Sequence, residues 1–143
     1  MCPMSSHYEV VLSCLLRDDT PDSVLAALRW HLGMDTEEPE DLDFEECPSP
    51  LLEPNPNSRL PGGDFVSLRR QVQGFSDAGE VHAWELFART YWVDDHMLYL
   101  TTLLDLIAPY VAVSGYGGHH RDEYGTATTA FVFHGGTYDP VGF

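Results

Sequence analysis

The chain contains no lysine, and all seven of its cationic side chains are arginines. Against these stand 23 acidic residues, so the formal net charge is −16. A field of this sign repels phosphate backbones, which argues against nucleic acid as a partner. The same field would attract a basic protein.

Cysteine is scarce as well. The three cysteines, Cys2, Cys14 and Cys47, show no paired spacing, which argues against a disulfide framework and against a zinc ribbon. Cys14 falls on the apolar side of a predicted strand. We therefore interpret it as a buried and unreactive thiol.

Long apolar runs are missing too. No run approaches the ~18 residues of a membrane span. The segment Met1–Ser6 has no basic residue ahead of an apolar block, as a secretory signal would require. We expect no association with membranes and a cytoplasmic location.

What the sequence does contain suits one folded domain. Its 143 residues are 43% hydrophobic, and a chain of this size buries ~68% of the surface that its unfolded form exposes. We expect a single α+β domain over residues 1–143 with an acidic, proline-rich insertion at residues 34–64. Residues 35–46 carry eight acids in twelve positions, and six of the ten prolines lie between residues 39 and 61.

The insertion allows two interpretations, because it has no regular hydrophobic period. We prefer a mobile acidic linker. The alternative is an ordered lid in which Phe44, Leu51 and Leu52 cover the surface around Trp30, which falls off the apolar side of its predicted helix.

Hydrophobic periodicity predicts the secondary structure elsewhere. Alternation predicts a first strand over 8–16 and helical spacing a helix after it, with Thr20 as N-cap, Pro21 at the first helical position and Gly33 as the stop. A second helix is predicted from residue 94 or 95 to 108. The other predicted strands cover residues 65–75, 81–93, 110–114 and 126–134. This order predicts a ferredoxin-like split βαβ sandwich, an antiparallel sheet with two helices on one face, plus an extra C-terminal strand.

Histidines gather at one end of this predicted topology. His96 begins the second helix, and His119, His120 and Asp122 follow the glycines at 115, 117 and 118. Imidazoles beside carboxylates could bind a divalent metal such as zinc, with His96, His119, His120 and Asp122 as ligands, or His96 could act as a general base. We prefer the alternative, in which these residues have structural or solvent-exposed roles and no cofactor is expected. Neither HExxH nor CxxC occurs, which supports this alternative.

The glycine-rich stretch 114–118 resembles a phosphate cradle only superficially. Such a loop needs a helix directly after it, and residues 119–125 have no helical pattern. We predict a β-bulge or a hairpin connection there.

The strand face opposite the helices is predicted to carry Glu9, Phe87, Arg89 and Tyr91. A cross-strand ion pair between Glu9 and Arg89 is expected, and if exposed it contributes less than ~1 kcal/mol. Phe87 and Tyr91 are large to leave in water. We therefore predict an interface here, covered by a second protomer or by the acidic segment.

No motif assigns a function. The sequence favours a non-catalytic binding or regulatory protein that acts as a homodimer. One alternative is a small metal-dependent or histidine general-base enzyme with its site at the His96, His119 and His120 end. A second alternative is an interaction module whose acidic segment docks a basic protein.

Overall fold

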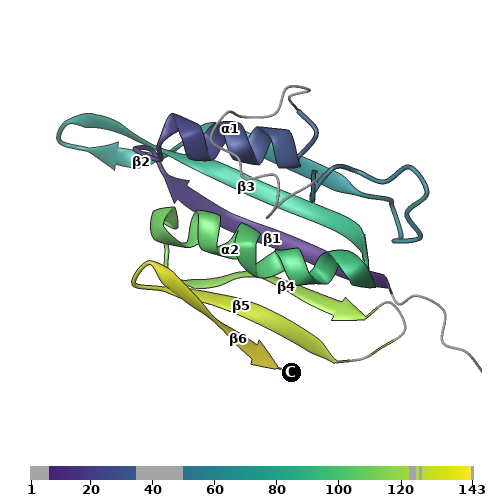
Figure 1. Ribbon diagram of the computed structural model, residues 1–143. Coiled ribbons are helices and arrows are strands. Elements are labelled where there is room, and N and C mark those ends of the chain that lie inside the picture. The colour runs from purple at the N-terminus through teal and green to yellow at the C-terminus, as the bar shows by residue number, and fades with distance from the viewer. Residues whose placement is uncertain (1–6, 35–49, 123–124, 126, 143) are drawn as a thin grey trace, which may run out of the picture.

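A computed structural model describes residues 7–34, 50–122, 125 and 127–142, with only the backbone of residues 94–96. Six strands form one antiparallel sheet in the order β2-β3-β1-β4-β5-β6 (Figure 1). The strands are β1 (His7–Arg17), β2 (Phe65–Ser76), β3 (Gly79–Val93), β4 (Gly115–Asp122), β5 (Thr128–His134) and β6 (Thr137–Gly142). The helices are α1 (Asp22–His31), the 3-10 helix η1 (Asp94–Tyr99), α2 (Leu100–Ile107) and the 3-10 helix η2 (Ala108–Tyr110).

The ferredoxin-like prediction is wrong. The sheet has six strands instead of five, and the two α-helices have only ten and eight residues. The first six residues of the expected second helix, from Asp94, form a 3-10 helix, which shortens α2. The molecule is a β-rich domain with two short helices rather than a helix–sheet sandwich of the predicted kind.

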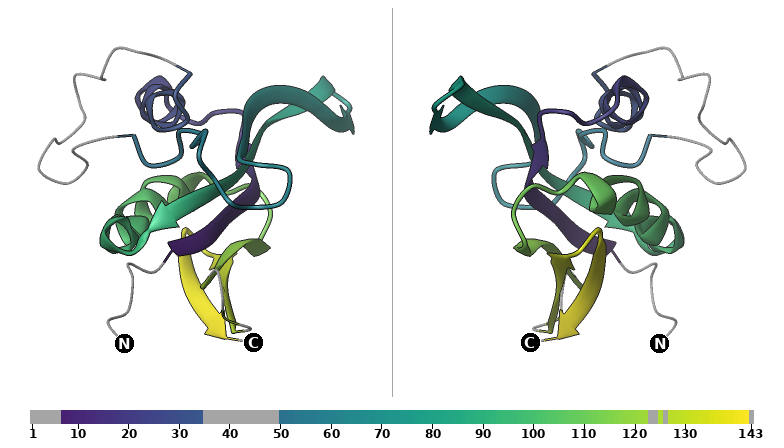
Figure 2. Two further views of the ribbon diagram at one scale, coloured as in Figure 1. Left: turned by 90° about the vertical axis from the view of Figure 1, so that its right-hand side faces the viewer. Right: turned by 90° about the vertical axis from the view of Figure 1, so that its left-hand side faces the viewer.

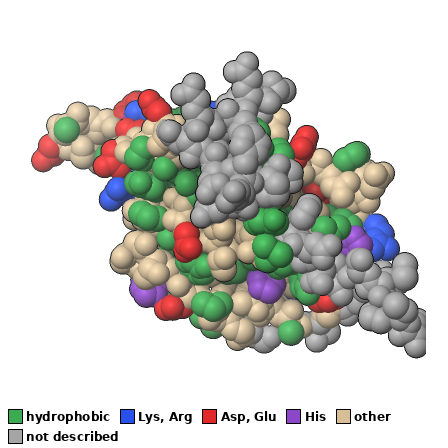
Figure 3. All heavy atoms as spheres, in the orientation of Figure 1, with side chains coloured by type: hydrophobic (Ala, Val, Ile, Leu, Met, Phe, Trp, Pro, Cys, Tyr) green, Lys and Arg blue, Asp and Glu red, His purple; other side chains and the backbone are tan. Residues whose placement is uncertain are grey.

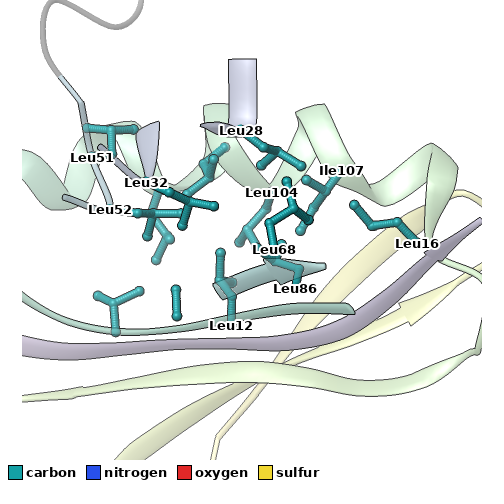
Figure 4. Packing of buried hydrophobic residues seen from close by; sticks show 14 of the residues in the cluster. Leu12, Leu16, Leu28, Leu32, Leu51, Leu52, Leu68, Leu86, Leu104 and Ile107 are labelled. Carbon is teal, nitrogen blue, oxygen red and sulfur yellow. The ribbon is translucent and has the colours of Figure 1, made fainter. Parts of the chain in front are cut away.

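One face of the sheet, the inner face, packs against the helices. Leu12 of β1, Leu28 of α1 and Leu104 of α2 are almost fully buried in one cluster (Figure 4). Burying a leucine side chain stabilises a fold by roughly 1.5–3 kcal/mol, so this cluster is the main source of stability. Cys14 lies beside it, and burial raises the pKa of its thiol to about 12, which fits the predicted unreactive thiol.

Several predicted elements are confirmed, and others are shifted. The strands over 65–75 and 81–93 correspond to β2 and β3, and Figure 2 shows their hairpin projecting from the rest of the sheet. Thr20 is not the N-cap of α1, because its hydroxyl donates to the Arg17 carbonyl at 2.6 Å and closes the preceding turn. The C-terminal tail forms β6 through a two-residue turn at Gly135 and Gly136, both with positive φ, as tight hairpins favour.

The fourth strand was predicted too early in the chain. In the structure Tyr110 ends the 3-10 helix η2, Val111 makes a single bridge to Leu16, and β4 begins only at Gly115 and contains the glycines. The predicted bulge is confirmed, since the pairing of β4 with β5 shifts between Tyr116 and His119. At Gly118, φ is +145° and a Cβ would lie 2.1 Å from the Val11 carbonyl oxygen. Only glycine lets β1 and β4 approach this closely.

Residues 50–64 are an ordered part of the domain. Leu51 and Leu52 are buried beside α1, and the Leu51 amide donates to Nδ1 of His31 at 3.2 Å. The chain then crosses to the other side of the sheet (Figure 2). For these two leucines the lid interpretation is confirmed. Phe44 and the acidic run at 35–49 lie outside the described residues.

The described helices are short. None of them is long and apolar enough to cross a bilayer, which requires about 20 residues.

Candidate functional site

The predicted histidine group is divided between the two faces of the sheet. His119 pairs with Val11 of β1 and His120 pairs with Val10, so consecutive side chains point to opposite faces. His119 reaches Glu9 on the outer face, whereas His120 lies under α2 against Phe131. Two side chains on opposite faces cannot bind one metal ion together.

The other members of the predicted metal set add little to it. The side chain of His96 lies outside what the structure describes. Asp122 pairs with Tyr8 at the start of β1. Within the described part of the chain, no three His, Cys, Asp or Glu side chains come together as metal ligands.

The outer face holds a polar network centred on Glu9. Nε of Arg89 donates to Glu9 Oε2 at 2.8 Å, and Nε of Arg121 donates to Oε1 at 3.0 Å. The predicted pair of Glu9 with Arg89 is thus confirmed, but it is not exposed, because only 7% of Glu9 is accessible. Burial alone raises the pKa of this carboxyl. The hydrogen bonds from the two arginines outweigh that effect and hold the pKa below its ordinary value.

His119 extends this network toward solvent. Its Nε2 lies 3.7 Å from Glu9 Oε1, and its Nδ1 shares a 2.6 Å hydrogen bond with the hydroxyl of Tyr116. Burial and the charge of Glu9 raise the pKa of Tyr116, so this hydroxyl stays protonated at neutral pH. The arrangement thus holds the imidazole between a carboxylate and a neutral phenol.

The segment 50–64 covers one end of the outer face. Arg89 donates to the carbonyls of Pro61 and Gly63 at 2.7 and 3.2 Å, and Arg59 donates to the hydroxyl of Tyr91 at 2.8 Å. Tyr91 is only 9% exposed as a result. Of the residues predicted at an interface, Glu9, Arg89 and Tyr91 are therefore covered by their own chain.

Phe87 remains exposed and lines a hollow on the outer face. We name this the outer hollow; it has a volume of about 490 Å³. Its lining residues are Ser13, Cys14, Leu15, Phe65, Ser67, Arg69, Glu85, Leu86 and Phe87. Phe65 and Phe87 are 59% and 37% exposed, and their ring centroids lie 6.0 Å apart. The outer hollow thus combines an open aromatic pair with polar side chains.

Sequence reasoning missed three contributors to this face. Phe65 was placed at the start of a strand but not on the face of Phe87, although pairing of β2 with β3 puts both there. Arg121 was missed because β4 was placed too early in the chain. Arg59 comes from the proline-rich insertion, where no periodicity predicts which side chains reach the sheet.

No protein-family model, curated protein or solved structure matches the chain.

Proposed function

We propose that the protein is a non-catalytic binding protein that acts as a homodimer through the outer hollow. The observation that carries the proposal is the pair Phe65 and Phe87, exposed side by side on an open sheet face. Aromatic side chains in a partly polar setting are typical of protein interfaces.

Charge explains why the occupant is a second copy. The outer hollow carries one arginine and one carboxylate, Arg69 and Glu85, which form a 3.0 Å ion pair with each other. In a twofold dimer the same patch faces itself, so each charge can meet its opposite on the partner. The hollow is therefore electrically neutral and a second copy meets no uncompensated charge there, although the whole chain carries a net charge of −16.

The first test replaces both phenylalanines. We expect light scattering to give the wild type twice the chain mass of 16.0 kDa and to show at least roughly tenfold weaker dimerisation for Phe65→Ser/Phe87→Ser, a change of about 1.4 kcal/mol. Phe75→Ser is the matched control, because Phe75 is 80% exposed on the same strand but does not line the outer hollow. A wild type that stays monomeric at about 0.5 mM, a concentration at which even weak specific dimers form, would contradict the proposal.

A second candidate function is capture of a basic protein, favoured by the net charge of −16 and the eight acids at 35–46. The salt dependence of binding distinguishes homodimerisation from capture of a basic protein. Raising salt from about 0.1 to 1 M shortens the Debye length from ~10 to ~3 Å, which weakens attraction to a basic partner but relieves repulsion between two acidic copies. We expect replacement of the eight acids by Asn and Gln to abolish binding of a nona-arginine peptide at low salt if this function is correct. Deletions should stop before residue 50, since Leu51 and Leu52 belong to the core. Peptide binding that the replacement leaves unchanged would eliminate this candidate.

A further inference from the structure

A groove of about 600 Å³ lies on the inner face of the sheet, between α2 and the strands β4, β5 and β6. Hydrophobic side chains are exposed where α2 borders the sheet (Figure 3). Its lining residues are Tyr8, Met97, Leu100, Thr101, Leu104, Asp105, His120, Phe131, Thr137, Tyr138 and Pro140. We name this the α2 groove. Its size falls in the ~300–1,000 Å³ range of small-molecule sites.

The α2 groove exists because the sheet is wider than its cover. The hairpin of β5 and β6 extends the sheet past β4, while α2 has only eight residues. The side chains of Phe131 and Phe133 are buried, whereas Thr137 and Pro140 of β6 are exposed. The floor of the groove is thus part of the core, and its rim is open to solvent.

His120 gives the floor an unsatisfied polar atom. Its ring packs between Tyr8 and Phe131, with centroid distances of 6.1 and 5.7 Å. Its Nδ1 is shielded from solvent, and no described group hydrogen-bonds to it. A ligand in the groove cannot reach this shielded atom, so it would hydrogen-bond to the ring at Nε2. Burial and the neighbouring His119 lower the pKa of His120, which keeps its imidazole neutral and able to accept a hydrogen bond.

The rim of the α2 groove is acidic. Asp105 lies at the edge of α2, and none of the described side chains that line the groove is an arginine. Burial and the charge of Asp105 raise the pKa of Tyr138, so the hydroxyl of Tyr138 remains neutral. An anionic ligand would meet the charge of Asp105 without a counter-ion, whereas a cationic ligand would be attracted by it.

We propose that the α2 groove binds a small aromatic amine, with its rings against Leu100, Leu104 and Phe131 and its ammonium group toward Asp105 and His120. The apolar floor supplies burial, the acidic rim selects the cation, and the neutral imidazole accepts one N–H. This site is independent of the proposed dimer, because it lies on the opposite face of the sheet from the outer hollow.

Three probes of similar size test the charge preference by calorimetry on the full chain: 1-naphthylmethylamine, 1-naphthol and 1-naphthoate. We expect the amine to bind with a dissociation constant below about 1 mM and at least roughly tenfold more tightly than the naphthoate, with the naphthol between them. Equal binding of all three, or no binding of the amine at about 5 mM, would overturn the proposal.

Variants locate the site. Asp105→Asn should weaken amine binding about tenfold and leave naphthol binding unchanged, and His120→Phe should weaken both, since it keeps a ring but loses the acceptor. His119→Phe is the matched control, because the neighbouring side chain faces the other side of the sheet. If His120→Phe does not fold, the site is located in the wild type by the NMR chemical-shift changes of its backbone amides on adding the amine. Shifts at Thr101 and Thr137 support the site, and shifts confined to Phe65 and Phe87 place the amine in the outer hollow and overturn it.

Discussion

Replacing Glu9 by glutamine is expected to lower the free energy of unfolding by about 2–3 kcal/mol at pH 7, because it leaves two arginines beside a buried neutral amide. Glu9 is 7% exposed and accepts from Arg89 at 2.8 Å and from Arg121 at 3.0 Å. Breaking a fully buried ion pair costs about 3–5 kcal/mol. We expect a smaller loss than this for Glu9→Gln, because the side chains of Arg89 and Arg121 are 25% and 36% exposed.

The control for this substitution is Asp18→Asn. Asp18 also receives two hydrogen bonds from an arginine, Arg70, but the pair lies in solvent, so a clearly smaller loss is expected. Urea denaturation of both variants gives the comparison, and equal losses would contradict the proposed role of Glu9.

Two further measurements probe the same network. Adding Arg121→Gln to Glu9→Gln should recover part of the lost free energy of unfolding, because it removes one unpaired cation.

The contribution of Glu9 to stability should depend on pH with a defined sign. The pKa of Glu9 is lowered in the folded state, so its contribution is present above its ordinary value of 4.5 and is lost as the pH falls through the folded value. The difference between wild type and Glu9→Gln should therefore shrink at acidic pH.

The sequence predicted a strand correctly where its side chains form a pattern typical of strands. It misplaced β4, whose glycines have no side chains, and it missed β6, which contains a proline. In β1 every second residue from Tyr8 to Leu16 is apolar, and in β3 the β-branched and aromatic residues and the turn before them indicated a strand, so the face of Glu9, Phe87 and Arg89 could be predicted. In β4 the glycines carry no pattern, and at Gly118 the close contact with Val11 that requires glycine is visible only when β1 is in place. Placing β4 too early in the chain turned His119 and His120 into a shared loop instead of two opposite faces.

The two candidate sites could be predicted only in part, because each depends on how strands pair and not on the pattern within one strand. Phe87 was predicted on an open face, and the structure leaves it exposed, but its partner Phe65 depends on the register of β2 with β3. The α2 groove depends on β6. This strand was not predicted, because Pro140 and the glycines around it are typical of an irregular C-terminal tail. Proline is tolerated there because β6 is an edge strand.

His31 should make the stability of the fold depend on pH between about 7 and 4. This side chain is 1% exposed, and burial lowers its pKa from 6.5 to about 4. The unfolded chain therefore takes up a proton below pH 6.5, whereas the folded chain resists until about pH 4. Acidification through this window favours unfolding, and about 2.5 kcal/mol is expected to be lost by pH 4.5, with no contribution from this group above pH 7.

The test compares the wild type with His31→Gln, which can keep an acceptor for the Leu51 amide but cannot titrate. The carboxylates titrate in both proteins, so the difference in urea midpoint between pH 7.5 and 4.5 reports His31 alone. His134→Gln is the matched control, since the side chain of His134 is 51% exposed, whereas His31 is buried. Equal pH dependence in wild type and His31→Gln would refute the role of His31.

Protonation of His31 should also affect the segment 50–64, which lies beyond α1. His31 also accepts the Leu52 amide at its carbonyl oxygen, at 2.9 Å, so both hydrogen bonds fasten the start of segment 50–64 to the end of α1. The same segment supplies the carbonyls of Pro61 and Gly63 to Arg89 on the outer face. Protonation of His31 removes the acceptor at Nδ1 and should therefore loosen the cover of Arg89 and Tyr91 before the sheet unfolds. Hydrogen exchange at pH 5 should show this order, with the amides of Leu51 and Asn55 exchanging faster than those of β1. Simultaneous exchange of the segment and β1 would mean that the segment opens only with the whole fold.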